Sequence, residues 1–368
     1  MKLKGTLALS ILPVLFSFQA QAFTVGVVML TQIEPRWYRE GFGVEQQLKN
    51  NGFNVDLFFS GDIDVSLQQR QIKRLSDDSN IDALVIGSID GNALKEALSV
   101  AKSKKLPVIS YDRLITGTDA VTYYATFDNG KVGQIQGQFL IEKLHPTVDD
   151  PKNIEIFYGS LDDNNAKFFY GEAMKILQPY IDKGALVVKS GQIKPEDTSI
   201  PSWRTDLASK RMDALIEQVG YAPDSGEKLD GILSPADCIS SGIIFTLKKK
   251  GYTVDNIPVI TGQDSTPEAL KNIQEGYQAM TILKDGKQLQ NAVLEMVKAI
   301  SQGKEATIND TSTYNNGVMD MKTFLCKPEL IDRSNLSKLL LSIFFLIYKS
   351  ALLQREAFED EHSVSNNP

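Results

Sequence analysis

Cysteine and histidine are scarce in this chain, and their scarcity removes several kinds of site. The 368 residues include two cysteines, Cys238 and Cys326, and two histidines, His145 and His362. The cysteines form no C-x-x-C pair, so we expect free thiols, although an oxidising compartment would permit a disulfide. Two histidines far apart in the sequence are too few for a histidine-based metal site and make a Ser-His-Asp triad improbable. We therefore expect no metal and no nucleophilic active site.

A phosphate cradle and a basic surface are also missing. The sequence has neither a G-x-G-x-x-G motif after its first expected strand nor a P-loop, so no nucleotide cofactor is expected. The net charge of −7 argues against a nucleic-acid partner, which favours a basic surface. At 42% hydrophobic and 23% charged residues, the composition is ordinary for a soluble globular protein. The length predicts two domains rather than one core.

The first 22 residues have the layout of a secretory signal peptide. Lys2 and Lys4 form a positive start, residues 7–18 are mostly apolar, and residues 20–22 (AQA) fit a small-x-small cleavage site. A membrane anchor is the alternative, but it needs about 20 apolar residues and this run is shorter. We therefore expect residues 1–22 to be removed and the protein to be exported to a bacterial periplasm.

Strand-like and helix-like segments alternate along the rest of the chain. This order predicts an α/β fold with parallel sheets and right-handed crossovers. The pattern restarts after residue 129 without a flexible linker, which indicates two lobes and a cleft closed by a hinge. The expected strands cover residues 23–30, 52–60, 81–88, 106–111 and 122–127 in the first unit, and 153–159, 185–190, 230–234, 257–261 and 278–283 in the second. The expected helices include residues 92–104.

Polar side chains follow many of these strands. Asp112 and Arg113 come directly after the strand at 106–111, and Asp264 and Lys284 follow two strands of the second unit. Ligands of open α/β sheets bind beyond the carboxyl ends of the strands, so we expect these groups to meet in one cleft. Aspartates in such loops also serve as helix N-caps, and Asp90 fits that simpler role.

The residue types at the strand ends suit a hydroxylated ligand. Carboxylates and amides accept hydrogen bonds from hydroxyl groups, and Arg and Lys donate to hydroxyl and ring oxygens. A Trp offers a flat apolar face to the C–H side of a sugar ring. The carboxylate pair of a glycosidase is an alternative, but no acid stands in an apolar setting that would raise its pKa. The sequence therefore favours a sugar-binding cleft without catalytic residues.

Several longer segments resemble one known family. They are IGSIDG (86–91), ISYDRLI (109–115), YYATFDN (123–129), GSLDDNNAKFFYGEAM (159–174), LQPYIDKGALVVKSGQ (177–192), VITGQD (259–264) and TYNNGV (313–318). With their spacing they resemble the periplasmic sugar-binding proteins of ABC importers, in the ribose/galactose/xylose cluster and nearest its multiple-sugar-binding members from plant-associated bacteria. The resemblance implies two Rossmann-like parallel-sheet lobes joined by a three-crossing hinge, which is the type I periplasmic binding protein or Venus-flytrap fold.

The resemblance also implies how the chain is divided. The implied hinge crossings lie near residues 127–129, 283–284 and 310–313. The N-terminal lobe then comprises residues 23–128 and 285–311, and the C-terminal lobe comprises residues 129–284 and 312–338. Residues 339–368 depart from the family pattern, because an apolar run at 339–348 precedes an acidic tail. A helix docked on the second lobe, a partner-binding patch and an aberrant end to the reading frame are the alternatives, of which we favour the last.

Ten side chains match sugar-contacting positions of the family. In many relatives an Asn precedes the position of Asp237, whereas this chain has Ala236 there, so Asp237 is either a ligand contact or a cap. The resemblance assigns no catalytic residue. The ten expected contacts are Arg36, Trp37, Asp112, Arg113, Asp163, Asn165, Trp203, Asp237, Asp264 and Lys284.

The resemblance implies a non-enzymatic solute-binding protein. It would capture a pyranose monosaccharide such as glucose, galactose, xylose or arabinose between its lobes and deliver it to an ABC permease, as a monomer. A second hypothesis is a sugar sensor that docks on a chemoreceptor or a sensor-kinase ectodomain. A third is a periplasmic glycosidase or sugar epimerase. Transport and sensing share one fold and one site, so the residues do not separate the first two.

Overall fold

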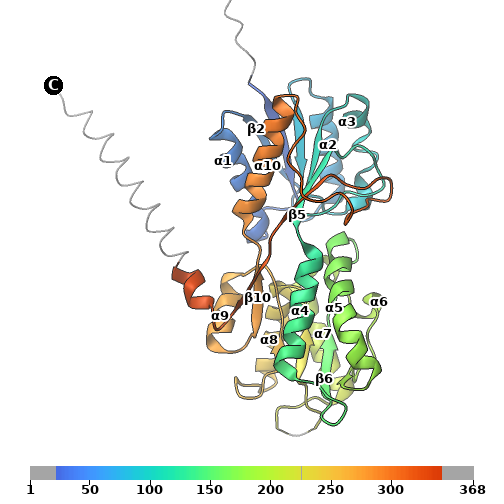
Figure 1. Cartoon of the computed structure of the whole chain (residues 1–368), viewed down its shortest axis with the longest axis vertical. Helices are drawn as coiled ribbons and strands as arrows, with labels where there is room; N and C mark the ends of the chain where they lie inside the picture. Colours follow the sequence, from blue (N-terminus) through green and yellow to red (C-terminus); the bar gives the residue numbers. More distant parts are fainter. Residues whose placement is uncertain (1–21, 225, 342–368) are drawn as a thin grey trace, which may run out of the picture.

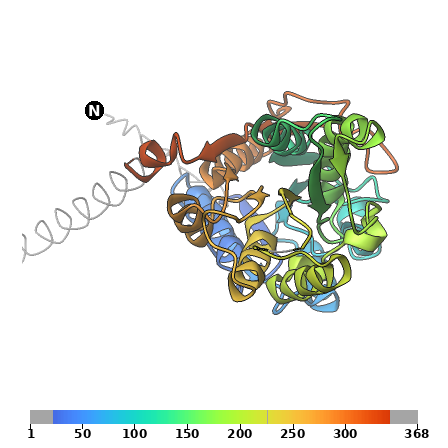
Figure 2. The same cartoon turned by 90° about the horizontal axis from the view of Figure 1, so that it is seen from below.

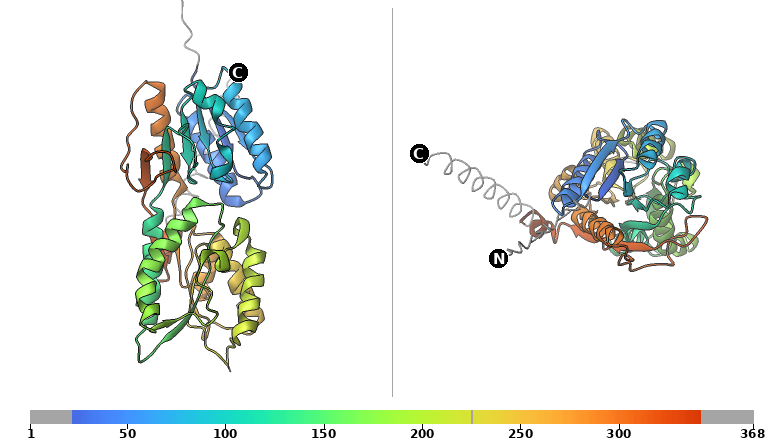
Figure 3. Two further views of the ribbon diagram at one scale, coloured as in Figure 1. Left: turned by 90° about the vertical axis from the view of Figure 1, so that its right-hand side faces the viewer. Right: turned by 90° about the horizontal axis from the view of Figure 1, so that it is seen from above.

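The computed structural model describes residues 22–224 and 226–341 (Figure 1). Nearly all of the expected signal peptide and most of the expected tail lie outside these residues. The described chain forms two α/β lobes placed one above the other along the long axis (Figures 1 and 3). Each lobe has its own buried apolar clusters, which is what a chain of this length requires.

The first lobe is built on a six-stranded sheet whose neighbouring strands are all parallel, in the order β11-β5-β4-β3-β1-β2. Its inner strands are runs of apolar and β-branched residues buried on both faces, as parallel sheets require. Helices α1 and α10 cover one face, and α2 and α3 cover the other. The strands are β1 (Thr24–Met29), β2 (Asn54–Phe59), β3 (Ala83–Ile86), β4 (Val108–Tyr111), β5 (Tyr123–Phe127) and β11 (Thr323–Cys326). The helices are α1 (Pro35–Lys49), α2 (Val65–Asp77), the 3-10 helix η1 (Gly91–Leu94), α3 (Ser99–Ser103) and α10 (Gly286–Ser301).

The second lobe holds a parallel sheet in the order β7-β6-β8-β9 and an antiparallel pair, β10-β12. Helices α4 and α5 pack on one side of the strands and α7 and α8 on the other (Figure 2). The strands are β6 (Lys152–Ile156), β7 (Leu186–Val187), β8 (Gly231–Leu233), β9 (Val259–Ile260), β10 (Met280–Leu283) and β12 (Glu329–Asp332). The helices are α4 (Asn129–Leu144), α5 (Asn164–Asp182), α6 (Pro195–Thr198), the 3-10 helix η2 (Pro201–Trp203), α7 (Thr205–Val219), α8 (Asp237–Lys249) and α9 (Pro267–Glu275).

The third passage between the lobes lies later in the chain than expected. Strand β11 pairs in parallel with β5 of the first sheet, with Phe324 opposite Ala125. Tyr314 and Met321 are buried in the first-lobe core. Only β12 returns to the second lobe, where it pairs with β10. The prediction that residues 312–338 belong to the C-terminal lobe, with a crossing at 310–313, is therefore wrong for residues 312–326, and the chain crosses at Lys327 and Pro328.

The expected helix at residues 92–104 is also divided. The structure has η1 and α3 there, with turns between them. Asp90 caps η1 by accepting a hydrogen bond from the Asn92 backbone N–H at 2.9 Å. The Gln69 side chain donates to the Ala93 carbonyl at 2.6 Å, and a continuous helix would need that carbonyl for its own ladder. Asp90 is thus the cap that the sequence suggested.

Candidate functional site

A cavity of about 320 Å³ lies between the two lobes, beyond the carboxyl ends of their strands. Its size falls within the range of roughly 300–1,000 Å³ that is usual for small-molecule sites. Nine of the ten side chains expected at a ligand line this one cavity. They are Arg36, Trp37, Asp112, Arg113, Asp163, Asn165, Trp203, Asp264 and Lys284.

The first-lobe wall is made by the start of α1 and the segment after β4. Glu34 caps α1 and so fixes the backbone of the two residues that follow Pro35. The Arg36 Nη2 atom lies 2.5 Å from the Asp112 Oδ2 atom. The guanidinium groups of Arg36 and Arg113 lie 4.8 and 5.6 Å from the centre of the Trp37 ring. Cation–π contacts of this kind hold charged donors and a flat aromatic surface in one fixed arrangement.

Asp264 is the acidic centre of the opposite wall. Its Oδ1 atom lies 2.8 Å from Lys284 Nζ and 3.7 Å from Arg36 Nη1. Burial alone would raise the pKa of Asp264, but the nearby positive charges of Lys284 and Arg36 outweigh it and lower that pKa below its usual range. Asp264 therefore stays ionised. Burial would likewise lower the pKa of Arg36, but Asp112 and Asp264 raise it, so Arg36 remains a cation.

A second ion pair crosses between the lobes at Arg113 and Asp163. The Arg113 Nε atom lies 3.0 Å from Asp163 Oδ2, and the other Asp163 oxygen caps α5 by accepting from the Asn165 N–H at 2.9 Å. Burial raises the pKa of Asp163 more than the Arg113 charge lowers it. Asp163 is therefore easier to protonate than Asp264, although both carboxylates face a cation.

Asn165 joins the lobes through both ends of its amide. Its Nδ2 donates to the Asp112 backbone carbonyl at 2.9 Å, and its Oδ1 lies 3.1 Å from the Tyr124 hydroxyl. Asp112 and Tyr124 belong to the first lobe, whereas Asn165 lies in the first turn of α5 in the second. Asn165 lines the cavity as expected, but its amide is already hydrogen-bonded to protein.

Trp203 forms an aromatic plate on the second-lobe wall. It packs against Gly159, where an added Cβ would lie only 2.1 Å from the ring, and its ring centre lies 6.4 Å from that of Phe169. The Trp203 Nε1 and Gln263 Oε1 atoms are buried and find no hydrogen-bond partner among the described residues. Two side chains of the cavity wall therefore carry a donor and an acceptor that the surrounding protein does not use.

Left-handed backbone concentrates at the cavity. Non-glycine residues rarely adopt positive φ, and strained positions cluster at functional sites. Of the eight such residues in the described ranges, five line the cavity. These are Ile63 (φ 57°), Asp112 (φ 60°), Ser202 (φ 50°), Trp203 (φ 58°) and Asp264 (φ 97°). The less favourable backbone conformations therefore lie where they set the direction of cavity-lining side chains.

Asp237 is the expected contact that the structure does not bring to the cavity. Its side chain is fully buried behind the wall and accepts hydrogen bonds from Thr266, Gln278 and Thr281. Its neighbours Ala236 and Cys238 line the cavity instead. The expectation of a direct ligand contact at Asp237 is wrong, because the first turn of α8 turns this side chain toward β10.

Twelve lining residues are not among the ten expected contacts, and four of them show how far the sequence could have indicated them. Phe169 follows Asn165 by one helical turn, and Arg204 directly follows Trp203, so both could have been found from their neighbours. Glu34 is the N-cap of α1, and this role hides its place at the cavity. Nothing in the sequence around Cys238 indicates that it lines the cavity. Both cysteines are free thiols, as expected.

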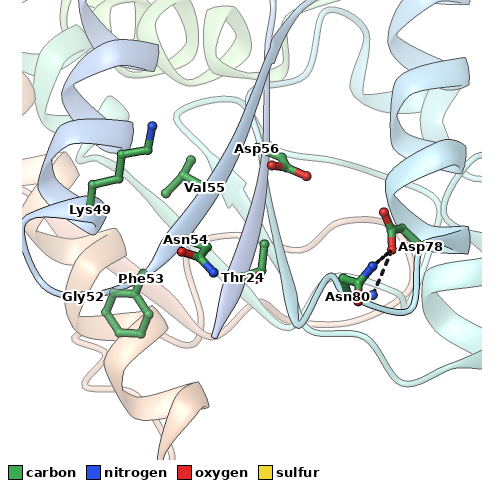
Figure 4. A pocket seen from close by; sticks show the side chains of 9 residues that line it. All are labelled: Thr24, Lys49, Gly52, Phe53, Asn54, Val55, Asp56, Asp78 and Asn80. Atoms are coloured by element: carbon green, nitrogen blue, oxygen red, sulfur yellow. Dashed lines mark hydrogen bonds between the residues drawn. The ribbon is translucent and has the colours of Figure 1, made fainter. Parts of the chain in front are cut away.

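A second depression, of about 670 Å³, lies at the other edge of the first sheet (Figure 4). It surrounds the amino ends of β1 and β2, with Lys49, Asp56 and Asp78 on its walls. Open α/β sheets bind ligands at their carboxyl ends, so this depression lacks the position of a functional site. Although this depression is larger, the inter-lobe cavity is the better candidate site, because charged and aromatic side chains of both lobes line it.

Two kinds of feature are absent from the described ranges. Residues 22–224 and 226–341 contain no group of three or more His, Cys, Asp or Glu side chains that could hold a metal ion. Within the same ranges, no helix is long and apolar enough to cross a membrane.

Two parallel-sheet lobes, three crossings and a polar, aromatic-walled cavity between the lobes define a two-lobed α/β binding protein. A sequence profile of the periplasmic binding protein domain family matches residues 25–305. The chain belongs to this family, as its sequence segments indicated, and it has the type I fold.

Known relatives cover nearly the whole described chain. The multiple sugar-binding periplasmic protein SbpA of Azospirillum brasilense is 42% identical over 315 residues, covering 85% of this chain and 86% of that protein. The multiple sugar-binding periplasmic receptor ChvE of Rhizobium radiobacter is 40% identical over 327 residues, covering 88% and 91%. An ABC transporter solute binding protein of Clostridium phytofermentans, crystallised with β-D-glucose, is 43% identical with a TM-score of 0.81, covering 86% of this chain and 96% of that one.

Proposed function

We propose that this protein binds a neutral pyranose monosaccharide in the inter-lobe cavity and delivers it to an ABC permease. The observation that carries the proposal is the cavity wall itself. It combines two tryptophan faces with ion-paired side chains whose remaining donor and acceptor positions point to a polar ligand.

The charge balance of the wall supports an uncharged ligand. The cations Arg36, Arg113 and Lys284 of the cavity wall each already face a carboxylate, so a charged ligand would leave an unpaired charge in a buried site. A hydroxylated ring adds hydrogen bonds without disturbing that balance. The four basic lining residues are Arg36, Arg113, Arg204 and Lys284, and the four acidic ones are Glu34, Asp112, Asp163 and Asp264.

The relatives support the same ligand class. SbpA and ChvE are named as multiple sugar-binding proteins, and the similar crystal structure from Clostridium phytofermentans holds β-D-glucose. These relatives are binding proteins, and we propose a non-enzymatic role for this chain too. We place it in the periplasm, with residues 1–22 removed as a signal peptide, because SbpA and ChvE are periplasmic.

A sugar that touches both lobes would stabilise the closed arrangement by its higher affinity for it. The closed pair of lobes is then the form that a membrane partner would recognise. A permease is the partner we propose, and a chemoreceptor or sensor-kinase ectodomain would use the same closed form. Retention of a permease on the immobilised protein from detergent-solubilised membranes, with and without sugar, tests the choice; retention of only a sensor would favour the signalling role.

Calorimetric titration of the mature protein with glucose, galactose, xylose and arabinose tests the ligand. We expect at least one sugar to bind with about micromolar affinity. Asp112→Ala removes the partner of Arg36 and should weaken binding at least about tenfold, since hydrogen bonds to charged groups contribute roughly 1.5–3 kcal/mol each. The matched control is Asp119→Ala, which removes an exposed first-lobe ion pair with Lys102. No heat of binding for any sugar at millimolar concentration would refute the proposal.

A further inference from the structure

Asp237 is a fully buried carboxylate directly behind the cavity wall. Its Oδ2 accepts a hydrogen bond from the Thr266 backbone N–H at 2.9 Å, and its Oδ1 accepts from Gln278 Nε2 at 2.9 Å. The Thr281 hydroxyl lies 2.9 Å from both oxygens. A buried charge is tolerated only when it is hydrogen-bonded. Three donors face the two oxygens of Asp237, and an ionised carboxylate can accept at both of them.

These bonds tie together the two segments that carry the acidic and basic groups of the second-lobe wall. Thr266 follows Asp264 by two residues, and Thr281 lies in β10, three residues before Lys284. The Thr281 hydroxyl also accepts from the Ser265 N–H at 3.2 Å. Asp237 therefore lies at the junction of both segments, and the Asp264–Lys284 ion pair of 2.8 Å forms where they meet.

The segment held by Asp237 is strained. Asp264 and Ser265 both have positive φ, at 97° and 49°. Such residues persist only when the surrounding structure over-determines them. At Gly262 the backbone comes so close that a Cβ would lie 2.3 Å from Asp237 Oδ1 and 2.5 Å from Gln278 Nε2. The carboxylate thus packs directly under the turn that aims Asp264 at the cavity.

We propose that Asp237 is a positioning residue for sugar binding, whose negative charge holds Asp264 and Lys284 in the arrangement that binds the ligand. The inference rests on the sugar-binding function proposed above. The Asp237 side chain does not line the cavity. It acts through its hydrogen bonds to the segment after Asp264 and to β10.

The position of Asp237 also makes its charge sensitive to pH. Burial and the negative charge of Asp264 raise the pKa of Asp237 to about 7. The other groups facing it are uncharged: Gln278, Thr281 and the thiol of Cys238, whose pKa burial raises further above its usual range. Protonation turns one carboxylate oxygen into a donor, so it releases a bond to Thr266 or Gln278. Sugar affinity should therefore be highest above pH 7 and fall as the pH drops through about 7.

The test compares glucose affinity from about pH 5.5 to about pH 8.5 in the wild type and in two variants. Asp237→Asn keeps the shape but not the charge. Glu155→Gln is the matched control, because Glu155 is another fully buried carboxylate of the second lobe that accepts from Ser190 and Tyr221 and does not line the cavity. Burial also raises the pKa of Asp163, but that group is unchanged in both variants.

We expect Asp237→Asn to bind glucose about tenfold more weakly at pH 8.5, the loss of one charged hydrogen bond, and to lose the fall in affinity around pH 7. Glu155→Gln should keep the affinity and the pH profile of the wild type. If Asp237→Asn does not fold, Thr281→Val removes one partner of the carboxylate and should weaken binding about threefold. Equal affinity and equal pH profiles in Asp237→Asn and Glu155→Gln would overturn the inference, whereas a wild type that binds no sugar would overturn the proposed function instead.

Discussion

Gly159 controls how deeply the Trp203 plate sits in the second-lobe wall. A Cβ at residue 159 would lie 2.1 Å from Cη2 of the Trp203 ring and 2.4 Å from Cζ2. Carbon atoms in contact need about 3.5–4.0 Å, so in Gly159→Ala the ring must move by roughly 1.5 Å. The ring lines the cavity, and the Trp203 backbone N–H donates to the Ile200 carbonyl at 3.1 Å, so the ring rather than the backbone is the part that moves.

A ring displaced this far no longer lies at the position from which it would stack on the ligand. We expect Gly159→Ala to weaken glucose binding by about 0.5–1.5 kcal/mol, or roughly 2- to 13-fold, when measured by calorimetry at a temperature where the variant is folded. Gly171→Ala is the control. Gly171 lies in α5 with no atom within 4 Å of an added Cβ, so this change should leave affinity unaltered and raise thermal stability slightly. Affinity of Gly159→Ala within twofold of the wild type would refute the argument that Trp203 meets the sugar face on.

Three further outcomes follow from the same cavity. Trp37 and Trp203 are the only tryptophans of the chain and both line the cavity, so glucose should change the intrinsic fluorescence, and a silent titration with measurable heat would contradict this. Asn165→Leu removes the hydrogen bonds that join α5 to the first lobe, so X-ray scattering should show a larger radius of gyration without sugar; an unchanged radius would count against a closing role. Glucose should protect the cavity-lining Cys238 from a maleimide at about pH 8.5, where a thiol of raised pKa still reacts slowly. Cys326 is buried elsewhere and should react equally slowly with and without glucose, and equal labelling of Cys238 in both conditions would place the ligand away from α8.

Much of the site could be predicted because it follows from a rule about strand ends. Asp112, Arg113, Asp264 and Lys284 each come within four residues after the end of a strand, and parallel strands bring their carboxyl ends to one edge. The order of strands and helices likewise predicted the two parallel sheets, since short connections leave few other topologies.

The errors came from contacts between residues far apart in the sequence. Strand β11 has only four residues, and nothing in them indicates that they pair with β5, almost 200 positions earlier along the chain. Asp237 stands at a strand-to-helix junction like the true cavity residues. Its direction is set by Gln278 and Thr281, which the sequence places some 40 positions away. A strand-end aspartate can therefore face a ligand or support the wall behind it, and only the packing of the next strand decides.

The same side chains that wall the cavity also join the lobes, so a ligand bound between them would favour the closed arrangement. Arg36 reaches Asp264, and Arg113 reaches Asp163, across the gap between the lobes. The Arg36–Asp264 separation of 3.7 Å is longer than the 2.5 Å of the Arg36–Asp112 pair within one lobe. The Arg36–Asp264 pair across the lobes is therefore weaker than the Arg36–Asp112 pair that positions the arginine. A hydroxylated ring that accepts from Arg36 and donates to Asp264 would connect these two groups more tightly than they connect directly, and would add to the direct Arg113–Asp163 contact. Such added contacts across the lobes are the differential affinity that closure requires.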